Sequence, residues 1–97
     1  MIIVWGSMTA RSDSLDELLK ISLEHVHRSR EEPGCLLHSV QIDVENKERL
    51  VFYEEWQDMA ALQAHFKVAE SGQFVQQAKQ LSESGGFDMS MYEANKL

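Results

Sequence analysis

The sequence lacks most of the features that mark secreted, disulfide-rich or membrane proteins. Cys35 is its only cysteine, so no disulfide can form within the chain, and a reducing compartment fits. No segment approaches the run of about 20 apolar residues that a membrane-spanning helix needs. Residues 1–6 lack the basic start and the long apolar core of a signal peptide. We therefore expect a cytoplasmic protein.

Positive charge is also scarce. The chain has 9 Lys and Arg against 16 Asp and Glu, which gives a formal net charge of −7. Such a chain repels phosphate groups, so we expect no binding to nucleic acid. Binding to an anionic membrane surface is disfavoured for the same reason. With 43% hydrophobic residues, we expect residues 1–97 to form one globular domain, near the lower size limit for a self-sufficient core.

The first third of the chain contains a strand pattern followed by a helix pattern. Residues 2–9 are rich in β-branched and aromatic side chains, which predicts a strand. Ser14 and Glu17 have the spacing of a capping box and predict the start of a helix over 14–30. The helix has one apolar stripe, made by Leu15, Leu18, Leu19 and Val26.

A turn and a hairpin follow this helix. Pro33 disfavours the helical conformation in the residue before it, and Gly34 tolerates any backbone angle. Alternating side chains then predict two strands, over 35–44 and 49–57. The polar residues 45–48 between them predict the turn of a hairpin.

The last third of the chain predicts two short helices and a strand. Asp58 is a good N-cap for a short helix that contains His65. We expect a break near residues 71–72, and a second short helix that ends at Gly85 and Gly86. The alternation in residues 87–92 predicts the last strand.

This order of elements predicts an α+β fold of the ferredoxin-like, split βαβ type, with a four-stranded antiparallel sheet. The helices can cover only one face of that sheet. Val51 and Tyr53 nevertheless lie on the face opposite to Phe52 and Trp56, so both faces are substantially apolar. We therefore expect a second copy to cover the open face in an isologous homodimer.

Four segments of the sequence resemble a known family. They are residues 30–35 (Arg-Glu-Glu-Pro-Gly-Cys), 43–46 (Asp-Val-Glu-Asn), 52–58 (Phe-Tyr-Glu-Glu-Trp-Gln-Asp) and 61–66 (Ala-Leu-Gln-Ala-His-Phe). With the chain length and the element order, they resemble the antibiotic biosynthesis monooxygenase family of the dimeric α/β-barrel superfamily. The resemblance implies a domain that dimerises into an α/β barrel. It also implies an enzyme that oxidises quinols or polyphenols with O₂ and uses no cofactor.

The sequence departs from two patterns of that family. Many members carry His-x-x-x-x-His beginning at the position of His65, but the second position here is Glu70. The branch that degrades haem carries a histidine in the helix that corresponds to residues 74–79, where this chain has none. Haem degradation is therefore not expected.

Oxygenation without a cofactor needs a dry aromatic pocket and a group that deprotonates the substrate. With the resemblance, His65 is the candidate general base, because its pKa lies near neutrality. Trp56 is the candidate wall that stacks on the substrate and donates its indole N–H. The structural alternatives are that Trp56 only fills the core and that His65 is a capping or surface residue.

Further candidates for substrate binding share the predicted pocket, and they are His38, Phe52, Glu54 and Phe66. A carboxylate such as Glu54 on an inward face must be paired or have a raised pKa. We expect it to orient His65 or to pair with Arg28 or Arg30.

We expect no metal site. His25 and His27 are two residues apart on a predicted helix and point about 200° away from each other. No other group of Cys, His and Asp has the sequence spacing of a zinc site.

The prediction from the sequence is a cofactor-independent monooxygenase that acts on a small aromatic substrate with O₂. Two alternatives stay open. One is a non-catalytic module that binds small hydrophobic ligands, as in a stress response. The other is an isomerase that uses His65 as acid and base on a small phosphorylated ketone, with Arg28, Arg30 or Lys67 near the phosphate.

Overall fold

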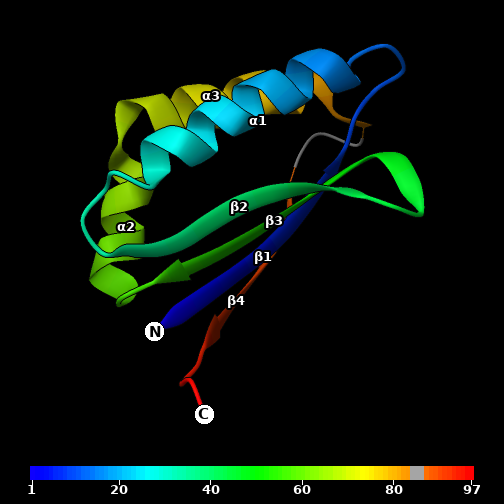
Figure 1. Ribbon diagram of the computed structural model, residues 1–97. Coiled ribbons are helices and arrows are strands. Elements are labelled where there is room, and N and C mark those ends of the chain that lie inside the picture. Colours follow the sequence, from blue (N-terminus) through cyan, green and yellow to red (C-terminus); the bar gives the residue numbers. More distant parts are fainter. Residues whose placement is uncertain (84–86) are drawn as a thin grey trace.

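The computed structural model describes residues 1–83 and 87–97, in which three helices lie on one face of a four-stranded antiparallel sheet (Figure 1). The strands are β1 (Ile2–Thr9), β2 (Cys35–Asp43), β3 (Asn46–Trp56) and β4 (Asp88–Glu93). The helices are α1 (Leu15–Ser29), α2 (Met59–Lys67) and α3 (Ala69–Leu81). The strand order β2-β3-β1-β4 confirms the predicted α+β, ferredoxin-like class.

Three local predictions differ from the structure. The hairpin turn is shorter than 45–48, because β3 already begins at Asn46, which pairs with Asp43. The break between the last two helices lies at Val68, whose backbone is extended, and not at residues 71–72, which belong to α3. The predicted end of the second helix at residues 85–86 lies outside the described residues.

The two predicted helix starts have different outcomes. Ser14 precedes α1, but its side chain makes no cap hydrogen bond, so the predicted capping box is absent. Asp58 caps α2 as predicted, because its Oδ1 accepts a hydrogen bond of 2.9 Å from the backbone N–H of Ala61. This cap stabilises the first turn of the helix that carries His65.

The side chains of β1 and β3 alternate between the two faces of the sheet. On the face under the helices, Val4, Leu50, Phe52 and Trp56 are fully or almost fully buried. In β2 the register shifts between Cys35 and Leu37, so that Cys35 pairs with Trp56. Regular alternation in β2 would place Leu36 on the helix-covered face with His38, but at this bulge its side chain is 56% exposed.

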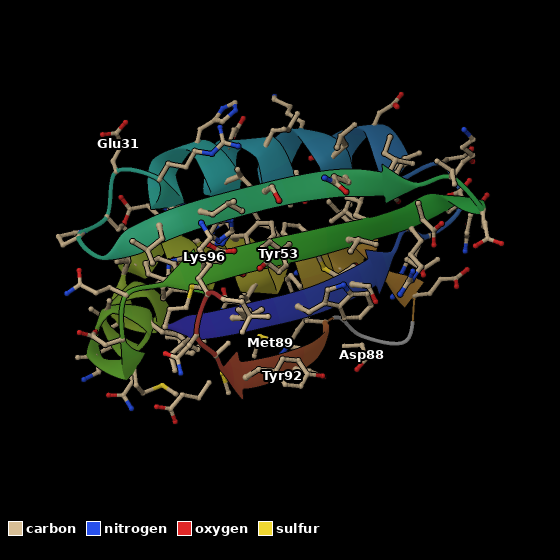
Figure 2. All side chains as sticks on the ribbon, turned by 60° about the horizontal axis from the view of Figure 1, so that its bottom comes forward. Glu31, Tyr53, Asp88, Met89, Tyr92 and Lys96 are labelled. Atoms are coloured by element: carbon tan, nitrogen blue, oxygen red, sulfur yellow. The ribbon has the colours of Figure 1, made fainter. Side chains whose placement is uncertain are left out.

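The other face of the sheet has no helix over it (Figure 1). Tyr53 and Tyr92 stand on this open face (Figure 2), together with Trp5, Leu37 and Val51. Trp5 is 38% exposed and Tyr92 is 57% exposed, so large apolar side chains meet solvent here. Among the described residues, no helix is long and apolar enough to cross a membrane.

Candidate functional site

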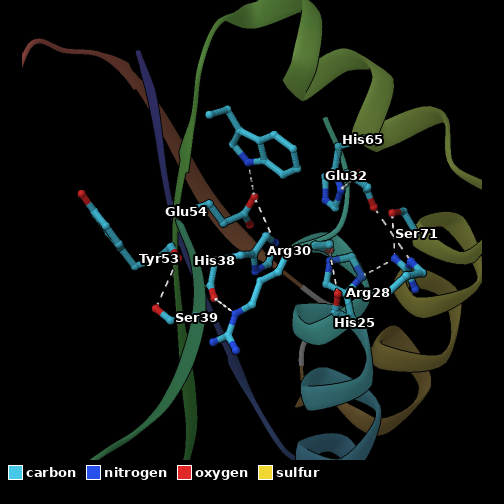
Figure 3. Close-up of polar contacts among 12 residues, drawn as sticks. His25, Arg28, Arg30, Glu32, His38, Ser39, Tyr53, Glu54, His65 and Ser71 are labelled. Atoms are coloured by element: carbon cyan, nitrogen blue, oxygen red, sulfur yellow. Dashed lines mark hydrogen bonds and ion pairs between the residues drawn. The ribbon is translucent and has the colours of Figure 1, made fainter. Parts of the chain in front are cut away.

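A cluster of buried polar side chains lies between the sheet and the helices, near the C-terminal end of α2 (Figure 3). It contains His25 of α1, His38 of β2, Glu54 of β3 and His65 of α2, all of which are buried. The ring centroids of the three histidines are 5.3, 5.2 and 5.6 Å apart. Four elements that are distant in sequence therefore bring four titratable groups together.

Helix α1 supplies His25 because this residue lies on the buried stripe of the helix. Leu18, Ser22, His25 and Ser29 follow one another at spacings of three or four residues, and all are buried. The His25 ring stacks on Phe74 of α3, with centroids 4.2 Å apart and planes at 9°. Burial is the largest of the effects that lower the pKa of His25 to about 2, so its imidazole is neutral.

Glu32 orients His65. The Nδ1–H of His65 donates to Oε1 of Glu32 over 2.8 Å, which leaves the lone pair on Nε2. Burial lowers the pKa of His65, and the hydrogen bond that it donates to Glu32 opposes that effect without cancelling it. Glu32 lies in the turn after α1, where Gly34 has a φ of 82° and packs against Ala61 of α2.

Glu54 is held by its neighbours on the sheet. Its Oε1 accepts a hydrogen bond of 2.8 Å from the indole N–H of Trp56 and lies 3.3 Å from Nε2 of His38. Burial raises the pKa of Glu54, but the nearby imidazole of His38 and the hydrogen bond from the Trp56 N–H outweigh it. The pKa of Glu54 therefore lies below its usual range.

The two arginines expected near Glu54 have other partners. Arg28 donates to Nδ1 of His25 over 2.8 Å and to Oγ of Ser71 over 3.0 Å, and its Nε lies 3.9 Å from Glu32. Arg30 donates to the backbone carbonyl of His38 over 3.0 Å. The prediction that Glu54 pairs with Arg28, Arg30 or His65 was therefore wrong, because its hydrogen-bond donor is Trp56 and its nearest basic group is His38.

A cavity of about 360 Å³ opens beside the cluster. His25, Glu54 and His65 form its polar end. Its other walls are mainly apolar and include Phe66, Phe74, Val75, Phe87 and Met89. A cavity of this size, with few polar groups, suits a small planar apolar ligand.

The cavity includes only part of the predicted set of residues. His65, Glu54 and Phe66 line it, but Trp56, His38 and Phe52 do not. Trp56 is fully buried against His65, with ring centroids 4.6 Å apart, so its predicted place as a wall of the pocket needs correction. His38 is buried beside Glu54, and Phe52 packs in the core against Phe74 and Phe87.

The sequence reasoning missed several residues of the site. His25 was considered only as a partner of His27, although its spacing from Leu18 and Ser22 places it on the buried stripe of α1. Glu32 was missed because it lies 33 residues from His65 and no local pattern links the two. Phe74, which forms the wall from α3, was missed for the same reason.

Comparison with known proteins gives one family and several relatives. The sequence model of the antibiotic biosynthesis monooxygenases matches residues 1–77. The uncharacterized protein sll1783 of Synechocystis is 31% identical over 80 residues, which cover 82% of this chain and 54% of that protein. The chain therefore spans about half the length of this relative.

Two solved structures have the same fold. One is a candidate antibiotic biosynthesis monooxygenase from Deinococcus radiodurans, which matches with a TM-score of 0.93 and 23% identity over 100% of this chain and 95% of that one. The other is Rv0793 from Mycobacterium tuberculosis, with a TM-score of 0.90 and 17% identity over 99% and 96%. With the family match over residues 1–77, the expected resemblance is confirmed, and this chain belongs to the antibiotic biosynthesis monooxygenase family.

Proposed function

We propose that this chain is a monooxygenase that oxidises a quinol or another polyphenolic small molecule with O₂ and needs no metal or flavin. One observation carries the proposal: His65 lines an apolar cavity while Glu32 holds its Nδ1–H. The carboxylate fixes the tautomer, so Nε2 is the nitrogen that accepts a proton. Phe66, Phe74 and Phe87 supply aromatic walls for a planar ring.

The proposed reaction begins with proton transfer. His65 takes the proton of a substrate hydroxyl, and the resulting anion gives one electron to O₂. The substrate radical and superoxide then combine through a C–O bond at a ring carbon that carries hydrogen. Loss of that hydrogen as a proton, with cleavage of the O–O bond, leaves a carbonyl and releases one oxygen atom as water. The sum is a phenol and O₂ giving a quinone and water.

The cavity supports this chemistry in two further ways. Its apolar walls offer water few hydrogen bonds, and a bound planar substrate would displace water from it, which strengthens electrostatic interactions at the polar end. Glu54 lies at the polar end, where its carboxylate is placed to accept a hydrogen bond from a second hydroxyl of a quinol. Trp56 does not line the cavity and acts indirectly, because its indole N–H donates to Glu54 and holds that carboxylate in position.

An oxygen electrode tests the proposal on protein dialysed against EDTA, with hydroquinones and anthrone-like phenols as substrates. We expect O₂ uptake, and we expect His65→Gln to lower kcat by about 10²–10⁴-fold, the usual contribution of a general base. His27→Gln is the matched control, because His27 lies on the exposed side of α1. Unchanged turnover in His65→Gln would show that another group is the base.

The same experiment separates the alternatives. Quenching of tryptophan fluorescence by these phenols without any O₂ uptake would indicate a non-catalytic binding module. An isomerase of phosphorylated ketones is less well supported, because none of the described residues that line the cavity is Lys or Arg. A phosphate group there would lack a cationic partner.

We further propose that the protein acts as a homodimer in which two copies pack open face to open face. The apolar side chains of Trp5, Leu37 and Val51 on that face support this arrangement. Light scattering should give the mass of a dimer, and Val51→Glu should give that of a monomer. Val44→Glu is the control, because Val44 is 83% exposed in the hairpin turn. A wild-type monomer would contradict the proposal.

A further inference from the structure

We propose that His25, His38 and His65 together bind one divalent transition-metal ion. One nitrogen from each ring can be chosen such that all three lie within 4.8 Å of one another. The three side chains come from α1, β2 and α2, and all are buried. Imidazole is a preferred ligand of zinc, copper, nickel and iron.

The arrangement of the rings fits a single ion. Zinc binds imidazole nitrogen at about 2.0–2.1 Å, so the ring centroids of two ligands in a tetrahedral site are about 5.2 Å apart. The observed centroid distances are 5.3, 5.2 and 5.6 Å. The three nitrogens lie within 4.8 Å of one another in the structure, and in a tetrahedral zinc site they would be about 3.4 Å apart, so they must move closer together. Rotation of the rings, rather than displacement of the helices and the strand, supplies this change.

His38 gives the second reason to place an ion here. Its side chain is fully buried, yet among the described residues neither ring nitrogen has a hydrogen bond of good geometry. Glu54 lies 3.3 Å from Nε2 but is not aligned with it. Buried polar nitrogens without partners are uncommon because each costs free energy. A metal ion in the centre of the three rings satisfies one nitrogen of His38.

Carboxylates surround the cluster as they surround many metal sites. Glu32 accepts the Nδ1–H of His65, which is the arrangement that orients a metal-bound histidine. Glu54 is buried beside His38 and supplies negative charge, and it is the nearest candidate for a fourth ligand. Glu32 and Glu54 each face a ring nitrogen of the cluster, whereas the guanidinium of Arg30 contacts only the backbone of His38.

Arg28 competes with the metal for one ligand. It donates to Nδ1 of His25, so in this state the proton of the His25 ring lies on Nε2. Coordination through Nε2 needs the proton to move to Nδ1 and Arg28 to turn away. Two groups beside Arg28 can then partner its guanidinium, namely Oγ of Ser71 at 3.0 Å and the carboxylate of Glu32 at 3.9 Å.

The inference does not rest on the proposed function, because metal binding is measured without substrate. It revises the expectation of no metal site. That expectation used only the spacing of residues along the sequence, which does not show contacts between separate helices and strands. The inference also limits the proposed reaction. The nitrogen of His65 that binds a metal ion cannot accept a proton from the substrate, so we expect Zn²⁺ to inhibit O₂ uptake and EDTA to restore it.

Titration of the EDTA-treated full chain with Zn²⁺, in competition with a chromophoric chelator, tests the site. We expect one Zn²⁺ per chain, and Co²⁺ should give the visible absorption of a site with nitrogen ligands. His25→Gln, His38→Gln and His65→Gln should each weaken Zn²⁺ binding by about 100-fold or more, beyond the effect of losing an outer partner. His27→Gln should bind Zn²⁺ as the wild type does, because His27 is exposed.

If the cluster variants fail to fold, a measurement on the wild-type protein still tests the site. One equivalent of Zn²⁺ should shift the ring ¹⁵N signals of His25, His38 and His65 and leave those of His27 in place. Binding that survives in folded cluster variants, or ring signals that do not move, would overturn the inference. Absence of O₂ uptake in the metal-free protein would count against the proposed oxygenase alone and leave the metal site standing.

Discussion

The space between the sheet and the helices has two ends that are equally buried and chemically different. At one end, Met8, Leu18, Leu50 and Phe52 form an apolar cluster whose members are at most 2% exposed. At the other end, His25, His38, Glu54 and His65 are 1–6% exposed. Burial stabilises the apolar end, whereas it costs free energy at the polar end unless every polar group has a partner. The difference separates where the fold is stabilised from where its reactive groups are held.

Strand β3 contributes to both ends. Its helix-facing residues are Leu50 and Phe52, followed by Glu54 and Trp56. The alternation of the strand continues unchanged while the chemistry changes from hydrocarbon to carboxylate and indole. The rigid apolar half therefore fixes the position of the polar half on the same backbone.

The largest expected effect comes from the apolar end. Phe52→Ala should lower the free energy of unfolding by about 3–5 kcal/mol, because it leaves a cavity between Phe74 and Phe87. Phe66→Ala, at the rim of the functional cavity, should cost about 1 kcal/mol or less, because Phe66 is 47% exposed. Urea unfolding followed by circular dichroism measures both, and equal costs would show that the apolar end does not stabilise the fold more than the rim of the cavity does.

A smaller effect is expected where the turn after α1 supports the polar end. Gly34→Ala should destabilise the fold by about 1–3 kcal/mol, because φ is 82° and the new Cβ would lie 2.5 Å from that of Ala61. The same change moves Glu32 away from His65, so turnover should fall as well. Thermal unfolding and an O₂-uptake assay on one preparation measure the two effects.

Gly72→Ala is the control for that variant. Gly72 lies inside α3, where a Cβ would meet no atom within 4 Å. Replacing a helical glycine by alanine should stabilise the protein by about 0.5–1 kcal/mol. If both glycine variants lose stability equally, the left-handed turn is not what holds Glu32 in place.

The sequence predicted the fold well because its signals were local. Alternation in the strands and the Asp58 cap each involve residues within a few positions of one another. The same kind of pattern failed at Ser14, where the spacing of a capping box was present and the hydrogen bond was not.

The site was only half predictable. Strand parity placed Glu54 on the covered face, and the family resemblance selected His65. The partners of these residues, Glu32 and His25, come from other elements, and their contacts depend on how α1 packs against α2 and β2. The homodimer stays a prediction.

The last expected effect is the acid sensitivity of the polar end, and it is specific to His25. Its pKa is about 2 in the folded protein and about 6.5 in the unfolded chain, so only the unfolded chain takes up a proton as the pH falls below 6.5. The groups that face it, Arg28, His38 and His65, keep it neutral together with burial. Keeping His25 neutral costs almost no free energy above pH 6.5. The cost grows as the pH falls toward 2, so the free energy of unfolding decreases in acid.

Between pH 7.5 and 5.5, His25 should account for a loss of about 1.4 kcal/mol in the free energy of unfolding of the metal-free protein. His25→Gln cannot take up that proton, so its loss over the same range should be smaller than the wild-type loss by this amount. His27→Gln should follow the wild type, because His27 is exposed on α1 and lies outside the buried cluster. Urea unfolding at the two pH values measures the difference. Parallel losses in all three proteins would mean that His25 is not held neutral, and that the two ends of the interior respond alike to acid.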